Sequence, residues 1–467
     1  MRFVWAGLLA VGFATSAYAN GRDPGTSTIN FRRDNDQHIL AGMTFGLVES
    51  RDGGATWQWM CERAVGYGGQ YDPDYVYSST GAIFATTFDG LKVRRNACTF
   101  ASAPPGMTFV ARVKGGPDGA IYYAAADLAD AKIYKSTDDG MTFPTSANPG
   151  QAGDWWSSLA IAPGNAQRIY LTGYRLDGVN PKIFLLYTST NGGTSYTAMN
   201  MTGITPVSAN STIDVVGISP TSDTTLYVKV TFESGGSGDS IYRSTDAGQS
   251  WTKILTRNSL YGLSFLVRTD ATTCVAGTRE LGAWISTDCS TAASPTWTAL
   301  AGAPHIGCLY NDSAGTVWAC TQNYPSPTIP SDGFGIMKTS DLSAWTGVLR
   351  FQDIQAPVSC PAGTVQEDQC VQRYMGNESV WCCLVNQLGI TSTAVDCTGA
   401  LACFGMGPGD GPVDGPVDGA PNVDGAPDGG TTKMKPRDGC CGAGAGRSSL
   451  MLGVLVAVVL LRRKRRA

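Results

Sequence analysis

A short motif that recurs along the chain constrains its fold more than any other feature of the sequence. The motif runs Ser, any residue, Asp, any residue, Gly, any residue, Thr or Ser, and then an aromatic residue. Its three complete copies contain Ser50, Asp52, Gly54 and Trp57; Ser136, Asp138, Gly140 and Phe143; and Ser244, Asp246, Gly248 and Trp251. Altered copies begin at Ser189, Ser286 and Thr339, and residues 93–100 occupy the place of one more. A unit repeated this regularly predicts a repeat architecture.

The spacing of the motif indicates the kind of repeat. Its seven starts lie 42 to 55 residues apart, and four short strands with their turns need about 40 to 45 residues. The Asp carboxylate can accept hydrogen bonds from backbone N–H groups of its own turn, and Gly takes a positive φ there. Residues 132–136 and 240–244, which lead into two of the copies, alternate as strands do. We therefore predict an all-β fold over residues 20–355, a seven-bladed β-propeller of four-stranded antiparallel blades.

The motif resembles the BNR or Asp-box repeat, which occurs in the propellers of sialidases, xyloglucan-active glycosidases, sortilin-type receptors and photosystem assembly factors. The resemblance covers residues 20 to about 352. It implies that each box lies on the turn between the third and fourth strands of a blade, away from the ligand face, and that the boxes are structural. The catalytic residues of sialidases are not carried over, because residues 29–34 contain no Arg-Ile-Pro motif.

The amino-terminal residues are typical of a secretion signal. Arg2 is followed by a short apolar run over residues 3–13 and by the cleavage pattern Ala17-Tyr18-Ala19. The apolar run is too short to span a membrane. We predict a signal peptide over residues 1–19, and therefore export of the mature chain.

The carboxyl-terminal residues 440–467 contain three features in series. Cys440 and Cys441 precede a small-residue stretch, an apolar run over residues 450–461 and a basic cluster over residues 462–466. Physically this is one transmembrane helix with its basic end on the cytoplasmic side. The order of features resembles the MYXO-CTERM sorting tail, which implies membrane anchoring, cleavage by a sorting protease near Cys440 and Cys441, and then display at the cell surface or secretion. A plain membrane anchor is the alternative.

Because an exported chain enters an oxidising compartment, we expect the 14 cysteines to form disulfides. Three bridges are predicted within the propeller: Cys308–Cys320, Cys274–Cys289 and Cys61–Cys98. Six further cysteines between residues 360 and 403 predict a small disulfide-rich module over residues 356–404, with the pairing left open. Residues 405–439 are rich in Asp, Gly and Pro, a composition that favours a disordered linker.

The loops before the first strand and between the second and third strands of each blade are expected to form the ligand face. Six residues in these loops are candidates for ligand binding through stacking or ionic contacts: Trp155, Trp156, Arg175, Asp177, Arg279 and Tyr324. Three acidic residues are low-ranking candidates for catalysis: Asp154, Glu233 and Glu280. Hydrolysis of a glycosidic bond needs two such carboxylates across the scissile oxygen.

These features predict an exported propeller that binds a glycan or a protein ligand without cleaving it. The alternative is a secreted glycoside hydrolase that uses an acidic pair on the same face, and a scaffolding role is a third option. No cofactor or metal is expected, since the chain contains only two histidines. A formal net charge of -4 leaves no basic footprint for nucleic acid.

Overall fold

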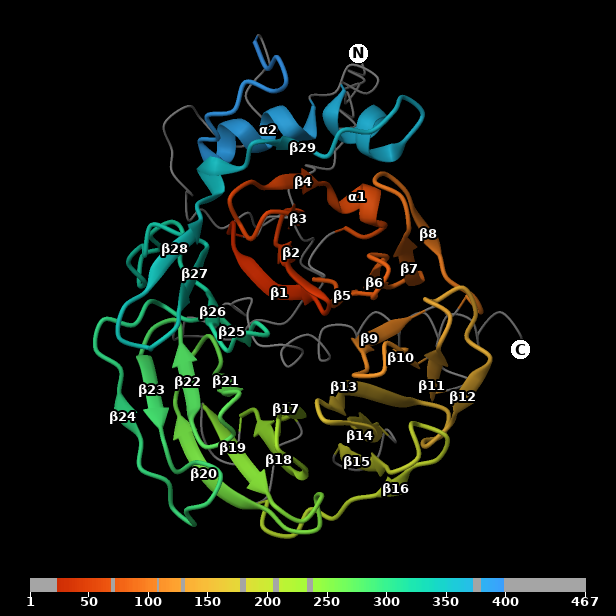
Figure 1. Ribbon diagram of the computed structural model, residues 1–467, viewed down its shortest axis with the longest axis vertical. Coiled ribbons are helices and arrows are strands. Elements are labelled where there is room, and N and C mark those ends of the chain that lie inside the picture. The colour runs from red at the N-terminus through yellow and green to blue at the C-terminus, as the bar shows by residue number, and fades with distance from the viewer. Residues whose placement is uncertain are drawn as a thin grey trace, which may run out of the picture.

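The computed structural model describes residues 23–398 except 69–71, 107–108, 127–130, 177–181, 205–209, 233–237 and 373–378. The predicted signal peptide, linker and sorting tail lie outside these residues. The predicted propeller is confirmed: seven blades, each with four antiparallel strands, are arranged around a central axis (Figure 1), and the sheet of blade 1 has a fifth, parallel strand. The first strand of each blade lies nearest the axis, and each blade is built from consecutive strands of the described chain.

The bounds of the strands show how evenly the blades divide the chain. Blades 1 to 3 comprise β1 (Thr26–Arg32), β2 (Asn35–Met43), β3 (Gly46–Ser50) and β4 (Gln58–Met60); β5 (Tyr75–Tyr77), β6 (Ile83–Thr87), β7 (Gly90–Arg94) and β8 (Phe100–Ser102); and β9 (Val110–Gly115), β10 (Ile121–Ala126), β11 (Ala131–Ser136) and β12 (Thr145–Ala147). Blades 4 and 5 comprise β13 (Asp154–Ala162), β14 (Asn165–Arg175), β15 (Ile183–Ser189) and β16 (Thr197–Ala198); and β17 (Ile213–Ser219), β18 (Ser222–Val230), β19 (Asp239–Ser244) and β20 (Thr252–Arg257). Blades 6 and 7 comprise β21 (Ser264–Val267), β22 (Cys274–Thr278), β23 (Gly282–Ser286) and β24 (Thr298–Ala299); and β25 (Cys308–Asn311), β26 (Val317–Cys320), β27 (Ile336–Thr339) and β28 (Thr346–Leu349).

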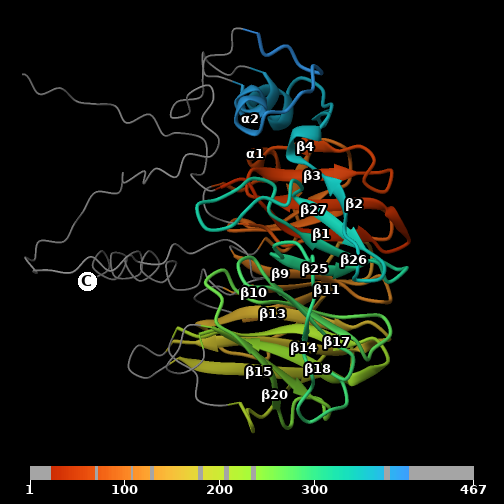
Figure 2. The ribbon, with the colours of Figure 1, turned by 90° about the vertical axis from the view of Figure 1, so that its left-hand side faces the viewer.

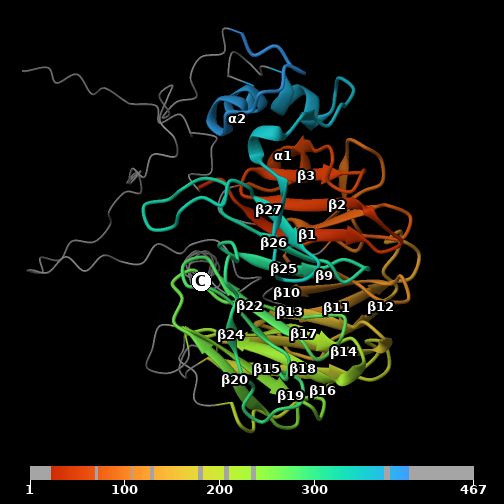
Figure 3. The ribbon, with the colours of Figure 1, turned by 60° about the vertical axis from the view of Figure 1, so that its left-hand side comes forward.

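A few short elements lie outside the blades. They are helix α1 (Glu62–Val65), a 3₁₀-helix (Phe351–Asp353), β29 (Ala356–Pro357), a π-helix (Gln366–Val371) and helix α2 (Val380–Leu388). Helix α2 lies outside blade 1, at the rim of the ring (Figure 2 and Figure 3). Among the residues that the structure describes, none of the helices has the length and apolar character needed to cross a membrane.

The second strands explain why parts of the sequence read as unbroken apolar runs. All six residues of β10, Ile-Tyr-Tyr-Ala-Ala-Ala, are buried, because the strand is covered on both faces by the neighbouring blades. Tyr123 of this strand stacks on Tyr134, with ring centroids 4.7 Å apart, and meets the box residue Phe143 edge-on at 4.8 Å. The aromatic residue of each complete box is likewise buried.

The boxes lie on the turns between third and fourth strands, and their hydrogen bonds follow the predicted scheme. The Ser50 hydroxyl donates to Asp52 over 2.8 Å and accepts from the N–H of Gly54 over 2.9 Å. Asp52 also accepts from the Thr56 hydroxyl at 2.6 Å and the Thr56 N–H at 2.9 Å. These bonds, first of all the one from the Thr56 side chain, lower the pKa of Asp52. The same network surrounds Asp138 and Asp246, so each intact box is a self-contained turn.

The degenerate turn of blade 2 keeps only a part of this hydrogen bonding, through a different residue. The side-chain oxygen of Asn96 accepts the N–H groups of Cys98 and Thr99 at 2.9 and 2.8 Å. Asn191 of blade 4 takes the place of the box Asp more closely, since it accepts the N–H of Ser195, four residues on, at 3.0 Å. In both turns an amide oxygen replaces the carboxylate.

The disulfides confirm two predicted pairs and correct the third. Cys308–Cys320 and Cys274–Cys289 form as predicted. Cys61 and Cys98 are not joined to each other; the bridges are Cys61–Cys370 and Cys98–Cys360. The disulfide-rich module is therefore bonded to blades 1 and 2 through two of its cysteines, and only Cys382–Cys397 is a bridge within its described part.

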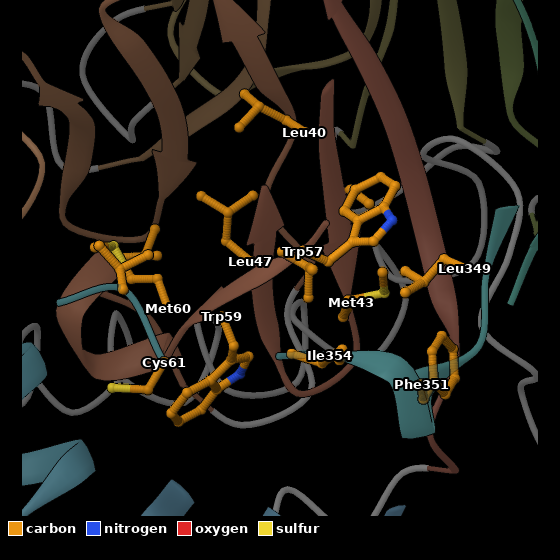
Figure 4. Packing of buried hydrophobic residues seen from close by; sticks show 14 of the residues in the cluster. Leu40, Met43, Leu47, Trp57, Trp59, Met60, Cys61, Leu349, Phe351 and Ile354 are labelled. Carbon is orange, nitrogen blue, oxygen red and sulfur yellow. The ribbon is translucent and has the colours of Figure 1, made fainter. Parts of the chain in front are cut away.

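The physical reason for this pairing is the route of the chain after blade 7. Strand β29 adds a fifth strand to blade 1 and runs parallel to β4. Phe351 and Ile354, just before β29, are buried in one cluster with Trp57 and Trp59 of blade 1 (Figure 4). The returning segment thus covers the outer edge of blade 1 and carries the module cysteines to the first two blades.

Candidate functional site

The propeller has two ends that differ in what they present. The loop face is formed by the segments before first strands and between second and third strands. The turn face, opposite, is formed by the turns between first and second strands and by the box turns. Asp177 and Glu233 lie outside the described residues, and the other catalytic and ligand-binding candidates belong to segments of the loop face.

Asp154 and Arg175 are brought together, and they bind each other. They are opposite residues of β13 and β14, at the loop-face end of blade 4. The Arg175 guanidinium donates to both carboxylate oxygens, at 2.8 Å for one of them, and the Gln151 N–H donates to Asp154 over 2.8 Å. The Asp154 side chain is 0% exposed. This two-point ion pair satisfies both groups and fixes the entry into blade 4.

Glu280 is held in a different way, in the loop between β22 and β23. One carboxylate oxygen accepts the backbone N–H of Leu260, which lies between blades 5 and 6. The other oxygen is buried and has no hydrogen-bond partner among the described residues. Glu280 thus connects two loops of the loop face.

Three aromatic side chains form a row across blades 2, 3 and 4 of the loop face. The ring centroids of Phe88 and Phe109 are 5.7 Å apart in a stacked arrangement, and those of Phe109 and Trp155 are 5.9 Å apart at 58°. All three are partly exposed. Trp156 points the other way along the strand, is buried in the core and meets Tyr187 edge-on. Of the adjacent tryptophans, Trp155 alone presents a surface to a ligand.

Arg279 reaches across the loop-face end of blade 7. Its guanidinium donates to Gln322 over 3.1 Å and lies against Gly307. A Cβ atom at residue 307 would come within 2.8 Å of the guanidinium, so an alanine there would displace the end of the Arg279 side chain.

Tyr324 holds the C-terminal module. Its hydroxyl donates to the backbone oxygen of Leu388 in α2 over 2.5 Å, and its ring lies 5.9 Å from that of Phe351. Burial raises the pKa of the phenol. The structure therefore places Tyr324 in the contact between propeller and module.

Four large apolar side chains of the loop face are exposed to solvent, on blades 4 to 6. The exposed fractions are 40% for Ile183, 42% for Phe232, 64% for Leu260 and 47% for Leu281. Phe232 also has a positive φ of 45°, which is rare for a bulky residue. Together with the aromatic row, these side chains give the loop face an apolar character.

Asp214, on β17, is a buried charge that sequence reasoning missed. It is 1% exposed, and one carboxylate oxygen accepts the Thr212 hydroxyl at 2.7 Å. Burial raises the pKa of this carboxyl, against the opposing effect of nearby Lys229. No sequence pattern around Asp214 indicates that it is buried, because its burial results from the packing of β17 in the propeller.

A cavity of about 400 Å³ opens on the turn face, where blades 7, 1, 2 and 3 meet. Its walls include side chains from the ends of β1, β5 and β25. No motif in the sequence indicated this cavity, because four separate blades contribute to its lining. Across the residues described, no cluster of three or more metal-ligating side chains occurs.

The strand topology defines the class of this protein as a seven-bladed β-propeller. Comparison with protein-family profiles and with curated proteins gives no match. Among solved structures, the chain is similar to an ancestral GH74 enzyme, with 15% identity over 65% of this chain and 44% of that one, and a TM-score of 0.48. It thus spans less than half of that enzyme.

Two further solved structures are similar to this chain at comparably low sequence identity. One is the GH74 xyloglucanase from Xanthomonas campestris, with 12% identity, 69% and 70% of the two chains covered and a TM-score of 0.35. The other is the Dos1 propeller, with 11% identity, 64% and 81% covered and a TM-score of 0.42.

Proposed function

We propose that this protein is an exported propeller that binds a glycan through its loop face without cleaving it. The aromatic row of Phe88, Phe109 and Trp155 supports the proposal most directly. Rigid, partly exposed rings on neighbouring blades offer apolar surface to the C–H faces of sugar rings. The exposed apolar side chains on blades 4 to 6 extend this surface, and they keep a protein ligand as the second choice.

The state of the acidic candidates supports binding over hydrolysis. A glycosidase needs one carboxyl to donate a proton and a second to act as base or nucleophile, about 5 to 10 Å away. Asp154 is committed to Arg175 through both oxygens and is fully buried, so it offers no oxygen to a substrate. Glu280 retains one oxygen without a hydrogen bond, and this keeps a glycoside hydrolase as the alternative.

We further propose that the propeller acts outside the cytoplasm and is displayed by its C-terminal tail. The five disulfides of the described residues are typical of exported proteins. The predicted transmembrane helix would hold the chain in the membrane, and a sorting protease would act near Cys440 and Cys441.

One experiment separates the three functions. The full exported chain, prepared in an oxidising compartment, is tested on a polysaccharide panel for retention and for release of reducing ends. Retention without release is expected, with at least tenfold weaker retention for Trp155→Ala and unchanged retention for the exposed turn-face variant Met141→Ala. Release that is lost in Glu280→Gln would establish a glycosidase. Neither retention nor release would contradict the glycan proposal and favour a protein ligand.

A further inference from the structure

The exposed apolar side chains of this protein are concentrated on the loop face. Of the six large apolar side chains that are exposed in the described part of the chain, four lie at the loop-face end of blades 4 to 6 and are called here the apolar patch: Ile183, Phe232, Leu260 and Leu281. Leu260 is the most exposed, at 64%. Large apolar side chains that gather on one surface mark a contact with another molecule or with a membrane.

Hydrogen bonds join the loops of blades 4 and 5 that contain the first half of the apolar patch. Lys182, the neighbour of Ile183, donates to the backbone oxygen of Ser211 over 2.8 Å. The Ser211 hydroxyl donates over 2.8 Å to the backbone oxygen of Phe232, in the loop between β18 and β19. The end of blade 4 and this loop of blade 5 are therefore neighbours on the loop face.

The same surface continues between blades 5 and 6. Gly238 ends the loop between β18 and β19, and a Cβ atom added there would lie 2.8 Å from the backbone oxygen of Arg257. Arg257 ends β20 and is followed by the segment that contains Leu260. The Leu260 N–H donates to Glu280, the residue before Leu281. The loops of the apolar patch therefore form one series across three blades.

Carboxylates do not interrupt the apolar patch within the described part of these blades. Asp154, Asp214 and Asp239 are buried, and Glu280 is half-buried and accepts the Leu260 N–H. Hydrocarbon can therefore cover this surface without leaving a charged group buried and unpaired. This favours a lipid over a protein partner, whose surface would bring polar groups that need hydrogen-bond partners.

The apolar patch begins where the aromatic row of Phe88, Phe109 and Trp155 ends. Trp155 lies on β13, opposite a residue of β14, and Ile183 is the first residue of β15, opposite the next residue of β14. Two strand spacings separate β13 from β15, so the Cα atoms of Trp155 and Ile183 lie about 10 Å apart. A ligand with a sugar part and a hydrocarbon part can therefore contact both surfaces at once.

The chain leaves the described structure on the loop-face side of the rim. Tyr324, in the loop between β26 and β27, donates to the backbone oxygen of Leu388 at the end of α2 over 2.5 Å. Loops between second and third strands belong to the loop face, so the end of α2 lies at that face. The predicted membrane helix over residues 450–461 thus follows in the chain from the same end of the propeller that carries the apolar patch.

We infer that the loop face binds the headgroup of a glycolipid within a membrane, an inference that rests on the proposed function and names the class of glycan. The sugar rings stack on the aromatic row, and the apolar patch enters the boundary between headgroups and acyl chains. Apolar side chains of surface-bound helices bury about 5 to 10 Å into this boundary. The tail holds the propeller beside the same membrane, which raises the effective concentration of the lipid.

Amide hydrogen exchange of the full exported chain, reconstituted through its tail into vesicles, tests this inference. Phosphatidylcholine vesicles are compared with the same vesicles containing glucosyl, galactosyl, mannosyl or N-acetylglucosaminyl lipids. Because the tail holds the chain on every vesicle, the measurement reports contact of the loop face and not recruitment. With at least one glycolipid, exchange over residues 258–262 and 280–283 should slow at least tenfold, and exchange over residues 139–142 of the turn face should not change.

Matched variants of exposed residues show whether the apolar patch makes the contact. Leu260→Ser combined with Leu281→Ser should remove the slowing. Met141→Ser should retain it, because Met141 is similarly exposed, at 60%, but lies on the turn face. All three side chains are exposed, so the thermal midpoints of these variants should stay close to that of the unmodified protein.

The water-soluble saccharides of the same glycolipids separate this inference from the proposed function. If a free saccharide slows exchange over residues 153–157 and no glycolipid vesicle slows exchange over residues 258–262 and 280–283, the loop face binds a glycan and the glycolipid inference is wrong. It is also wrong if plain phosphatidylcholine vesicles slow exchange as much, or if the double leucine variant keeps the effect. If neither saccharides nor glycolipids slow exchange on the loop face, both proposals are wrong.

Discussion

Removing both disulfides between the module and the propeller should lower the free energy of unfolding by more than the sum of the two single removals. In one variant Cys61 and Cys370 are both replaced by Ala, in a second Cys98 and Cys360, and in a third all four. Each change removes a whole bridge, so no free thiol remains. The two disulfides span sequence separations of 309 and 262 residues, and both join the residues after blade 7 to the first two blades.

The magnitude follows from the loops that the bridges close in the unfolded chain. With one bridge intact, the other closes a loop of only about 47 residues, the 37 between the propeller cysteines and the 10 between the module cysteines. The chain-entropy relation then gives about 4 kcal/mol for losing either bridge first. Losing the remaining one opens a loop of the full separation and costs about 5 to 6 kcal/mol.

Urea unfolding of the three variants, followed by tryptophan fluorescence, measures these differences. A control lacks the local bridge Cys274–Cys289, which closes 15 residues and should cost about 3 kcal/mol. That cost should be the same with or without the module bridges. If the second module bridge costs no more than the first, the two do not share one loop and the reasoning fails.

Other changes test the packing and the charges. Gly173→Ala should lower the free energy of unfolding by about 1 to 3 kcal/mol, because a Cβ there would overlap the backbone oxygen of Trp155 on the neighbouring strand. Gly68→Ala, with open space around it, should leave the thermal midpoint unchanged. The hydrogen bonds of its box lower the pKa of Asp138 from 3.8 to about 2, so the stabilisation that the carboxylate provides is present above pH 4 and lost as the pH falls towards 2. In Asp138→Asn the thermal midpoint should therefore depend less on pH over that range, and an unchanged dependence would contradict this. Burial raises the pKa of Asp214, which favours the folded state at low pH and opposes it once the carboxyl ionises. At pH 7 the thermal midpoint of Asp214→Asn should therefore be higher than that of the unmodified protein, and this gain should be smaller at pH 4. A midpoint below that of the unmodified protein at pH 7 would refute the assignment.

Features set by neighbouring residues were predictable from the sequence. The box of Ser50 and Asp52 makes its hydrogen bonds within seven residues, so its pattern is written in consecutive positions. The number of blades could be predicted from the number of boxes, because each box forms the turn of one hairpin in one blade. Cys308–Cys320 was predictable for the same reason, since the two residues face each other across one hairpin.

Features that depend on the ring were not predictable. The partners of Cys61 and Cys98 follow 309 and 262 residues later in the chain, and their position depends on how β29 returns to blade 1. Trp155 and Trp156 are adjacent and chemically alike, and only the register of β13 decides which one is buried. The turn-face cavity needs side chains from four blades, none of which forms a motif.

The way the ring closes has a consequence for biogenesis. A chain that is exported amino terminus first presents Cys61 and Cys98 to the oxidising compartment well before Cys360 and Cys370. Thiolates in that compartment form mixed bridges with whatever partner is within reach. The native pairing therefore requires either that the early thiols remain reduced until translocation is nearly complete or that an early bridge is exchanged. Correct oxidation of this propeller should thus depend on a disulfide isomerase more strongly than its repetitive, locally folding blades would suggest.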